Sequence, residues 1–349
     1  MKKCNYCAFT SYTSGESARE RYISALSKEM AEKKFPAQTL YIGGGTPSFL
    51  SAELIEKLLA EIEKNFGPIK NFVESTFEMN PESVTDEKLQ ILKKYGFNRI
   101  SIGAQTFGGK GLKTLGRAHD SRTFFNAYAQ IKSTGFANMN IDLIAGFPSQ
   151  TFDDFKDDIK EIILLNPNHV SVYGLQIEEG TKLFEAGFNP DQILMRKMLE
   201  HAHVALKSAG YLHYEISNYA KPGFESKHNN NYWLGGDYIG LGCAAASFVG
   251  GKRFSNPENL EKYLENPGAP DFEEVLTGKE KLGENIIIGL RRLDGISLTD
   301  ETQKNFGREI KNLIAAGLLE QTGRQIKLTE EGIFLSNEVF EYFVMPFGD

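Results

Sequence analysis

Short apolar runs alternate with longer amphipathic stretches from about residue 38 to residue 216. The runs are bounded by Gly, Pro and Asn, as buried strands are, and the stretches between them repeat every three to four residues, as helices do. The strands that this pattern predicts are QTLYIGGG, FVESTFEMN, RISIGAQTF, NMNIDLIAGFP, HVSVYGLQI and YLHYEIS. Six successive βα units predict an α/β fold whose parallel sheet curls into a complete or partial barrel.

The pattern changes after residue 217. The segment that follows is rich in Gly and Asn and holds the single Trp, which predicts irregular structure that crosses a surface or covers a pocket. From about residue 275, two helical stretches precede a hairpin, LLEQTGRQIKLT, and a last helix, EEGIFLSNEVFEYFV. This order is winged-helix-like, and its mixed charges favour a packing or lid role over DNA binding.

Composition narrows the classes of function. The chain has 46 acidic and 39 basic side chains, a net charge of −7, which argues against nucleic acid as the partner. Three cysteines cannot form a secreted disulfide framework, and no stretch approaches the roughly 18 apolar residues of a membrane span or forms a signal peptide. We therefore expect a cytoplasmic protein without a transmembrane segment, in which cysteines stay reduced.

Polar and glycine residues follow the predicted strands. GGGTP ends the first strand, and Glu78, Gln105, Asp142 and Glu178 stand near the ends of later ones. Each could be a turn residue or a helix cap. Because function in a barrel lies at the carboxyl ends of its strands, the set predicts a ligand site on one rim.

Cys4 and Cys7 form a Cys-x-x-Cys pair at the start of the chain. This spacing is typical of metal ligands, but two thiolates are too few to complete an ordinary zinc or iron–sulfur site. Either part of the site is missing from this sequence, or another group supplies a ligand.

Many motifs along the chain resemble those of one family. They are CNYCAF, YIGGGTPSFL, EMNPESV, RISIGAQTF, LGRAHD, NIDLIAGFPSQT, HVSVYGLQIEEGT, HYEISNYAKPG, HNNNYW and LTEEG. Their order is similar to that of the radical S-adenosylmethionine (SAM) proteins of the oxygen-independent coproporphyrinogen III oxidase group. The resemblance implies a partial (β/α)6 TIM-like barrel over residues 1–216, a connecting segment over 217–274 and an α+β, winged-helix-like module over 275–349.

Two features resemble the heme chaperone branch of that group. Phe9 stands where the oxidase has a further cysteine, and HNNNYW begins at His228. The resemblance implies that heme and apo-hemoproteins, including respiratory ones, are the partners, with transient contact to membrane proteins. Whether the chain is an enzyme stays uncertain. The alternatives are the oxidase itself, which uses SAM to convert coproporphyrinogen III to protoporphyrinogen IX, and a cluster-free heme-binding protein on the same scaffold.

The resemblance also implies a role for Cys4 and Cys7. Three cysteines of the family hold a [4Fe–4S] cluster, and the fourth iron binds SAM. Cys4 and Cys7 match the second and third of these ligands, and the first would precede Met1. We expect that the printed start is an internal Met and that the missing cysteine lies upstream; without it, cluster assembly is in doubt.

The remaining site residues follow from the same family motifs. Gly44, Gly45 and Thr46 resemble the SAM-binding glycine motif, in which a missing side chain lets the backbone approach the cofactor. The family's polar contacts to SAM correspond to Glu78, Gln105, Arg117 and Asp142, of which the Arg is suited to a carboxylate by its forked donors. The alternative roles of these side chains are caps and ion pairs.

His228 is the candidate heme ligand, because imidazole ligates heme iron and Tyr232 and Trp233 could pack on a porphyrin. Its alternative role is to pin the segment by hydrogen bonds. The chain departs from the family at Ala246, where the family has His. Cys243 could replace part of that contact, although a buried free thiol is the plainer interpretation.

Overall fold

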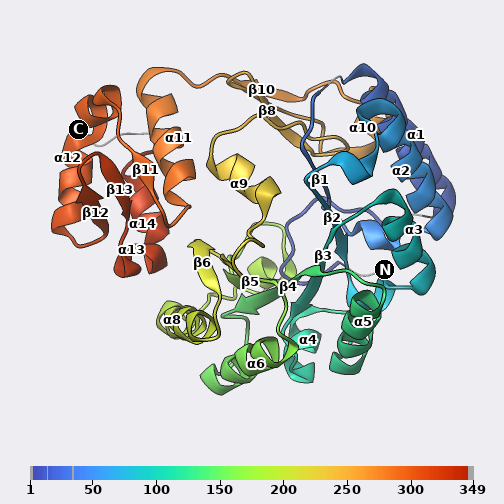
Figure 1. Ribbon diagram of the computed structural model, residues 1–349, viewed down its shortest axis with the longest axis horizontal. Coiled ribbons are helices and arrows are strands. Elements are labelled where there is room, and N and C mark those ends of the chain that lie inside the picture. Colours follow the sequence, from blue (N-terminus) through green and yellow to red (C-terminus); the bar gives the residue numbers. More distant parts are fainter. Residues whose placement is uncertain (1–2, 14, 34, 345–349) are drawn as a thin grey trace.

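The computed structural model, which describes residues 3–13, 15–33 and 35–344, is built around a curled seven-stranded sheet. Its strands are, in spatial order, β1 (Thr39–Ile42), β2 (Glu74–Met79), β3 (Arg99–Gln105), β4 (Asn138–Ala145), β5 (His169–Gly174), β7 (Asn218–Ala220) and β6 (Leu212–Glu215). Neighbours from β1 to β5 are parallel. The partial barrel that the sequence predicts is confirmed, and Figure 1 shows its open half-barrel form.

The far edge of the sheet differs from the prediction. The sixth predicted strand, β6, does not pair with β5, because the short strand β7 folds back between them and is antiparallel to both. The Glu215 carboxylate fixes this turn, since it accepts hydrogen bonds from the Ser217 amide at 3.0 Å and from the Asn218 side chain. The sixth strand therefore belongs to a hairpin and does not form a fifth parallel pair.

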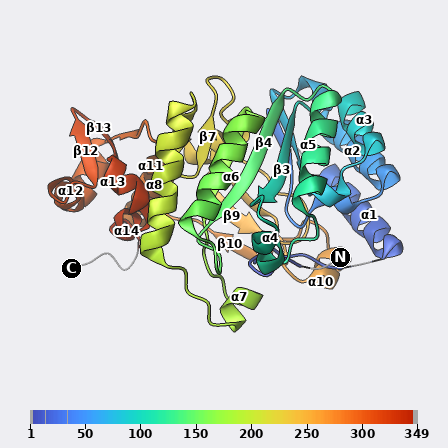
Figure 2. The same ribbon diagram turned by 90° about the horizontal axis from the view of Figure 1, so that it is seen from below.

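Helices cover the outer face of the sheet. They are α1 (Glu16–Glu32), α2 (Ala52–Phe66), α3 (Asp86–Tyr95), α5 (Ser121–Ser133), α6 (Phe152–Leu165) and α8 (Gln192–Ser208). The short helices α4 (Gly109–Leu115) and α7 (Lys182–Glu185) lie in the loops after β3 and β5, where Leu115 and Leu183 belong to a separate small hydrophobic cluster. Their caps agree with the sequence: Ser51 accepts from the Leu54 amide, and Gly96 ends α3 in the left-handed conformation. Figure 2 shows the long helices side by side along the sheet.

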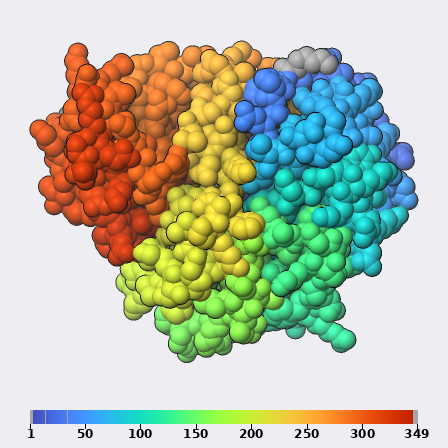
Figure 3. All heavy atoms as spheres, viewed as in Figure 1, coloured from blue at the N-terminus to red at the C-terminus, as the bar shows by residue number. Residues whose placement is uncertain are grey.

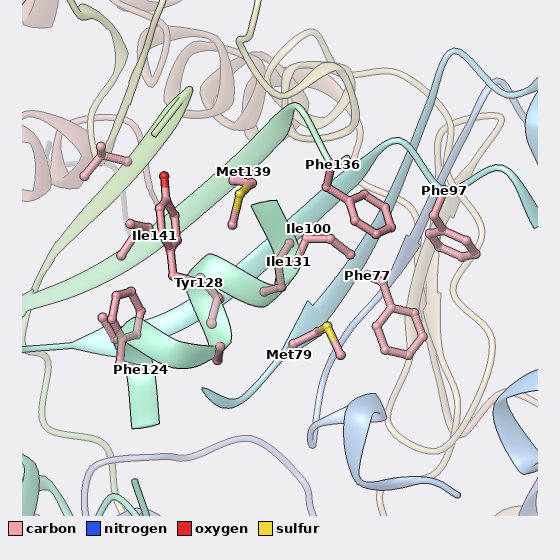
Figure 4. Close-up of a cluster of buried hydrophobic side chains, with 14 of the residues drawn as sticks. Phe77, Met79, Phe97, Ile100, Phe124, Tyr128, Ile131, Phe136, Met139 and Ile141 are labelled. Carbon is pink, nitrogen blue, oxygen red and sulfur yellow. The ribbon is translucent and has the colours of Figure 1, made fainter. Parts of the chain in front are cut away.

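The main hydrophobic core lies between these helices and the outer face of the strands. Phe77, Ile100 and Ile141 are fully buried there, with Phe124 and Ile131 of α5 packed against the sheet in Figure 4. Because side chains alternate across a strand, this arrangement turns every second residue toward the inside of the half-barrel.

The inner face of the sheet is polar. Residues alternating with the core carry hydroxyl, amide and charged groups: Tyr41, Thr76, Glu78, Arg99, Ser101, Asn140, Asp142, His169 and Ser171. The predicted strands are thus apolar on the helix-covered side only. A polar lining suits a cavity that holds a ligand and water, and it differs from the packed interior of a closed TIM barrel.

The segment after β7 is more regular than the sequence predicts. It contains α9 (Lys227–Trp233), the antiparallel strands β8 (Ala246–Val249), β9 (Lys252–Ser255) and β10 (Phe272–Glu274), and α10 (Leu260–Glu265). Glu29 of α1, fully buried, holds this segment by accepting from the Gly242 amide at 2.9 Å, from Asn256 Nδ2 at 2.7 Å and from the Tyr263 hydroxyl at 2.7 Å. In Figure 1 the segment passes over the top of the molecule to the C-terminal module.

The C-terminal module has its own hydrophobic core. Its elements are α11 (Gly278–Leu290), β11 (Ile296–Ser297), α12 (Asp300–Ala315), β12 (Leu319–Thr322), β13 (Gln325–Leu328), α13 (Glu330–Phe334) and α14 (Ser336–Glu341). The predicted order of two helices and a hairpin is confirmed, although the last predicted helix is broken at Leu335. Across the described ranges, the helices are all too short or too polar to cross a bilayer.

Candidate functional site

A chamber of about 1360 Å³ occupies the inside of the half-barrel. Nine of the ten residues that the sequence predicts for the site line it, and only His228 does not. The nine are Cys4, Cys7, Gly44, Gly45, Thr46, Glu78, Gln105, Arg117 and Asp142. The structure therefore brings together side chains that lie up to 138 positions apart, from Cys4 to Asp142.

The cysteine loop is fastened at one end of the chamber. The Asn5 amide donates to the Leu115 carbonyl at 2.9 Å, and the Asn5 side chain donates to Thr114 at 2.9 Å. A turn in which the Cys7 amide reaches the Cys4 carbonyl at 3.4 Å places the two free thiols on one loop. Burial raises the pKa of the Cys7 thiol, so a metal cation is needed to favour its thiolate.

Arg117 links the cysteine loop to the strand ends. Its Nη1 lies 3.6 Å from Cys4 Sγ, and its Nη2 donates to Asn80 Oδ1 at 2.9 Å and to the Gly103 carbonyl at 3.0 Å. The Nε atom is buried without a partner. A Cβ at Gly103 would lie 2.7 Å from Gln105 Nε2 and 3.4 Å from Arg117 Nη2, so a larger residue there would displace the end of the Gln105 side chain.

Glu78 stands at the end of β2 beside the glycine motif. It accepts from the Tyr41 hydroxyl at 2.6 Å and from the Gly44 amide at 3.1 Å. Gly44 has a φ of 101°, which disfavours any other residue, and a Cβ on Gly43 would lie 2.7 Å from the Glu78 carboxyl carbon. Burial raises the pKa of Glu78 to about 7, so its charge changes near neutral pH.

Asp142 and Gln105 complete the polar end of the chamber. Asp142 accepts from Asn140 Nδ2 at 2.7 Å and from Ser101 Oγ at 3.4 Å, while burial raises the pKa of its carboxyl. Gln105 has a φ of 67° at a bulge between β3 and β4, which turns it away from the regular pleat. The bulge explains how a residue at the very end of a strand lines the chamber.

These residues fit SAM as a ligand. Its ammonium and sulfonium groups are cations, which suit Glu78 and Asp142, and its carboxylate suits Arg117, whose buried Nε has no partner. For a [4Fe–4S] cluster, Cys4 and Cys7 provide two thiolates. The described residues contain no group of three metal-ligating side chains, so they satisfy only part of that donor set.

His228 lies apart from the chamber, in α9 beside β1. Thr39 Oγ1 is 2.8 Å from its Nδ1, the Tyr232 hydroxyl is 2.7 Å from its Nε2, and its ring stacks on Tyr41 with centroids 5.2 Å apart. Burial lowers the pKa of His228 to about 4. Both ring nitrogens therefore have hydrogen-bond partners within the protein. These contacts fit the role in which the imidazole fixes the position of its segment by hydrogen bonds.

The start of α9 is anchored on the inner face of the barrel. Glu74, which is 3% exposed, accepts from the Ser226 hydroxyl at 3.3 Å, the Lys227 amide at 3.1 Å and the His228 amide at 3.0 Å. The Tyr214 hydroxyl accepts from the Ser226 amide at 3.2 Å and lies 2.8 Å from Nε2 of the buried His169. These contacts fix the position of the HNNNYW motif.

Sequence reasoning missed several residues of the chamber. Tyr41, Asn80 and Asn140 bond directly to predicted site residues, and Arg291 lines the chamber from the C-terminal module. Alternation along the strands could have identified Tyr41 and Asn140. Tyr41 lies two residues before Gly43, and Asn140 lies two residues before Asp142, so each points to the same side of its strand as the later residue. No sequence signal marked Arg291.

The chain is similar to known proteins over nearly its whole length. A model described as the radical SAM superfamily matches residues 1–162, and one described as the HemN C-terminal domain matches residues 276–335. Proteins named heme chaperone HemW are 34% identical in Lactococcus lactis, covering 98% of this chain and 94% of that protein, and 35% identical in Bacillus subtilis, covering 98% and 96%. The corresponding protein of Escherichia coli is 32% identical and covers 99% and 95%.

A solved structure shares the fold. Coproporphyrinogen III oxidase (HemN) from Escherichia coli, described as a radical SAM enzyme, superposes with a TM-score of 0.86 over 99% of this chain and 87% of that chain. Its sequence identity is 23%, which supports the likeness of fold alone.

Proposed function

We propose that this chain, which belongs to the HemW family of radical SAM proteins, binds heme and transfers it to apo-hemoproteins. The observation that carries the proposal is the extent of the chamber. It continues from the SAM-type residues of the barrel to Arg291 and Phe334 of the C-terminal module. Its volume of about 1360 Å³ exceeds the roughly 300–1,000 Å³ of ordinary ligand pockets, which leaves room for heme.

The site residues predicted from the sequence would hold the resident groups of the family. Cys4 and Cys7 would hold two irons of a [4Fe–4S] cluster, and Glu78, Gln105, Asp142 and Arg117 would hold SAM beside the backbone of Gly44, Gly45 and Thr46. When bound, the cluster supplies electron transfer and SAM supplies a cleavable sulfonium. The protein's own contribution would be to orient SAM by the carboxylates of Glu78 and Asp142.

Heme transfer itself is ligand exchange at iron. It requires a site that holds heme without closing over it, and the seven-stranded sheet does not close on itself, since β1 and β6 are its two edges. Partners of this activity would be apo-hemoproteins, including respiratory ones, which the chain would contact transiently at membranes.

A transfer assay tests the proposal. Heme-loaded chain is mixed with an apo-hemoprotein, and holoprotein formation is followed by absorption. The control separates the two proteins by a dialysis membrane that only free heme crosses. We expect faster holoprotein formation when the proteins are in contact. Equal rates of holoprotein formation with and without the membrane would contradict direct transfer.

The oxidase is the second candidate, and one experiment separates it from the chaperone. The reconstituted chain is incubated anaerobically with SAM, a reductant and coproporphyrinogen III. We expect no protoporphyrinogen IX, because Phe9 stands where the resemblance places a further cysteine in the oxidase. Catalytic formation of that product would replace the chaperone proposal with the oxidase.

A further inference from the structure

The chamber has a second wall, formed where the barrel meets the C-terminal module. We call it the junction wall, and no site residue predicted from the sequence lies on it. Its members are Met195, Leu199, Ile216, Tyr219, Asn229, Arg291, Ile333 and Phe334. Most are apolar, and Arg291 is the single cation among these described residues. An apolar surface with one cation suits a large flat ligand that bears carboxylates.

Two contacts fix the position of Arg291. It is the C-cap residue of α11, where its backbone N–H donates to the carbonyls of the last turn, and its guanidinium carbon lies 4.4 Å from the centroid of the Trp233 ring. An arginine stacked on an aromatic ring keeps the edge of its planar fork available for a bidentate partner. Trp233 belongs to the HNNNYW motif, so one function of the motif is to orient this arginine.

Within the described residues, the guanidinium of Arg291 forms one long ion pair, and its Nε has no partner. Its ion-pair partner, Glu215 Oε2, lies 3.6 Å from Nη2, longer than a hydrogen bond, and its Nε is buried without a partner. Glu215 is fully buried, and its other oxygen receives the Ser217 amide and the Asn218 side chain. The side chain of Arg291 is 29% exposed and lines the chamber, so its guanidinium can reach a ligand there.

We propose that the junction wall binds the propionate edge of heme, with Arg291 as the carboxylate-binding residue and the Asn229 amide as a second donor. The apolar members of the wall pack on the porphyrin ring. The inference rests on the proposed function, since it locates the same heme. It also gives the HNNNYW motif a new division of roles: His228 pins α9, Asn229 faces the chamber, and Trp233 orients Arg291.

The test compares two probes that differ only in their carboxylates, heme and heme dimethyl ester. Each is titrated against the full chain and against Arg291→Gln. The matched control is Arg292→Gln, because Arg292 is the next residue and pairs with Asp294. We expect Arg291→Gln to weaken heme binding about tenfold or more, the effect of losing a charge-assisted hydrogen bond, and to leave ester binding unchanged. The control should bind both probes as the unchanged chain does.

Other outcomes overturn the inference in distinguishable ways. Equal losses for heme and ester would show that Arg291 acts only through the fold, and no loss for either would remove it from the site. Should Arg291→Gln fail to fold, the unchanged chain still tests the proposal. Equal affinity of that chain for heme and for the ester would exclude a contact with the propionates. If the unchanged chain binds neither probe, the proposed function itself fails.

Discussion

Replacing Glu74 with Ala should release α9 from the barrel while leaving the sheet intact. Three donors at the start of α9, from Ser226, Lys227 and His228, share the two oxygens of this carboxylate. A hydrogen bond to a charged group contributes about 1.5–3 kcal/mol. No residue of α9 itself is buried, so water can replace part of the lost hydrogen bonding. We therefore expect the loss of all three hydrogen bonds to lower the free energy of opening of α9 by about 3 kcal/mol. That value corresponds to about a hundredfold change in the opening equilibrium of α9.

Amide hydrogen exchange measured by mass spectrometry is the assay, because it reports local opening. Exchange in peptides covering residues 226–234 should become about a hundredfold faster, while peptides of α11 and α12 keep their rates. The control is Glu87→Ala, which removes an exposed carboxylate from the first turn of α3. Unchanged exchange in 226–234 would refute the anchoring role of Glu74. Uniformly faster exchange would show that Glu74 supports the whole fold instead.

Three further predictions concern the site. The folded-state pKa of Glu78, about 7, lies above its ordinary value, so its carboxylate goes from about a tenth ionised at pH 6 to about nine tenths at pH 8. SAM, a cation, should therefore bind up to about tenfold more tightly at pH 8 than at pH 6, as measured by equilibrium dialysis. Glu78→Gln should remove this pH dependence of SAM binding. If the dependence persists in the variant, a group other than Glu78 causes it. Cys4→Ser should reduce iron and acid-labile sulfide to background after anaerobic reconstitution, and retained cluster would exclude this thiolate as a ligand. His228→Ala should leave the absorption spectrum of bound heme unchanged, because both ring nitrogens have protein partners, whereas a changed spectrum would restore the imidazole as an iron ligand.

The regular part of the fold could be predicted from the sequence because its strands and helices have clear periodicity. β7 could not, since three residues carry too little pattern and its pairing depends on Glu215 and the turn that follows it. The order of α9 and of β8 to β10 also depends on distant contacts. Glu74 and Glu29 bind these segments from positions about 150 to 230 residues earlier.

The site was predictable to the extent that it follows from sheet topology. The carboxyl ends of parallel strands meet at one edge, so Glu78, Gln105 and Asp142 had to lie close together. His228 had no such constraint, because its segment pairs with no strand and its position depends on Thr39 and Tyr41. Arg291 is on another module, and sequence alone could not place that module against the barrel.

The dependence of α9 on Glu74 also constrains the order of events during synthesis. A helix of seven residues has little stability by itself, and its anchoring carboxylate emerges from the ribosome more than 150 residues before it does. Until residues 226–228 arrive, the nascent barrel exposes Glu74 and His169 at its base to water. The HNNNYW segment therefore reaches the base of the half-barrel after all strands of the sheet, and we expect a chain truncated before residue 226 to form the strands but leave Glu74 without these three donors.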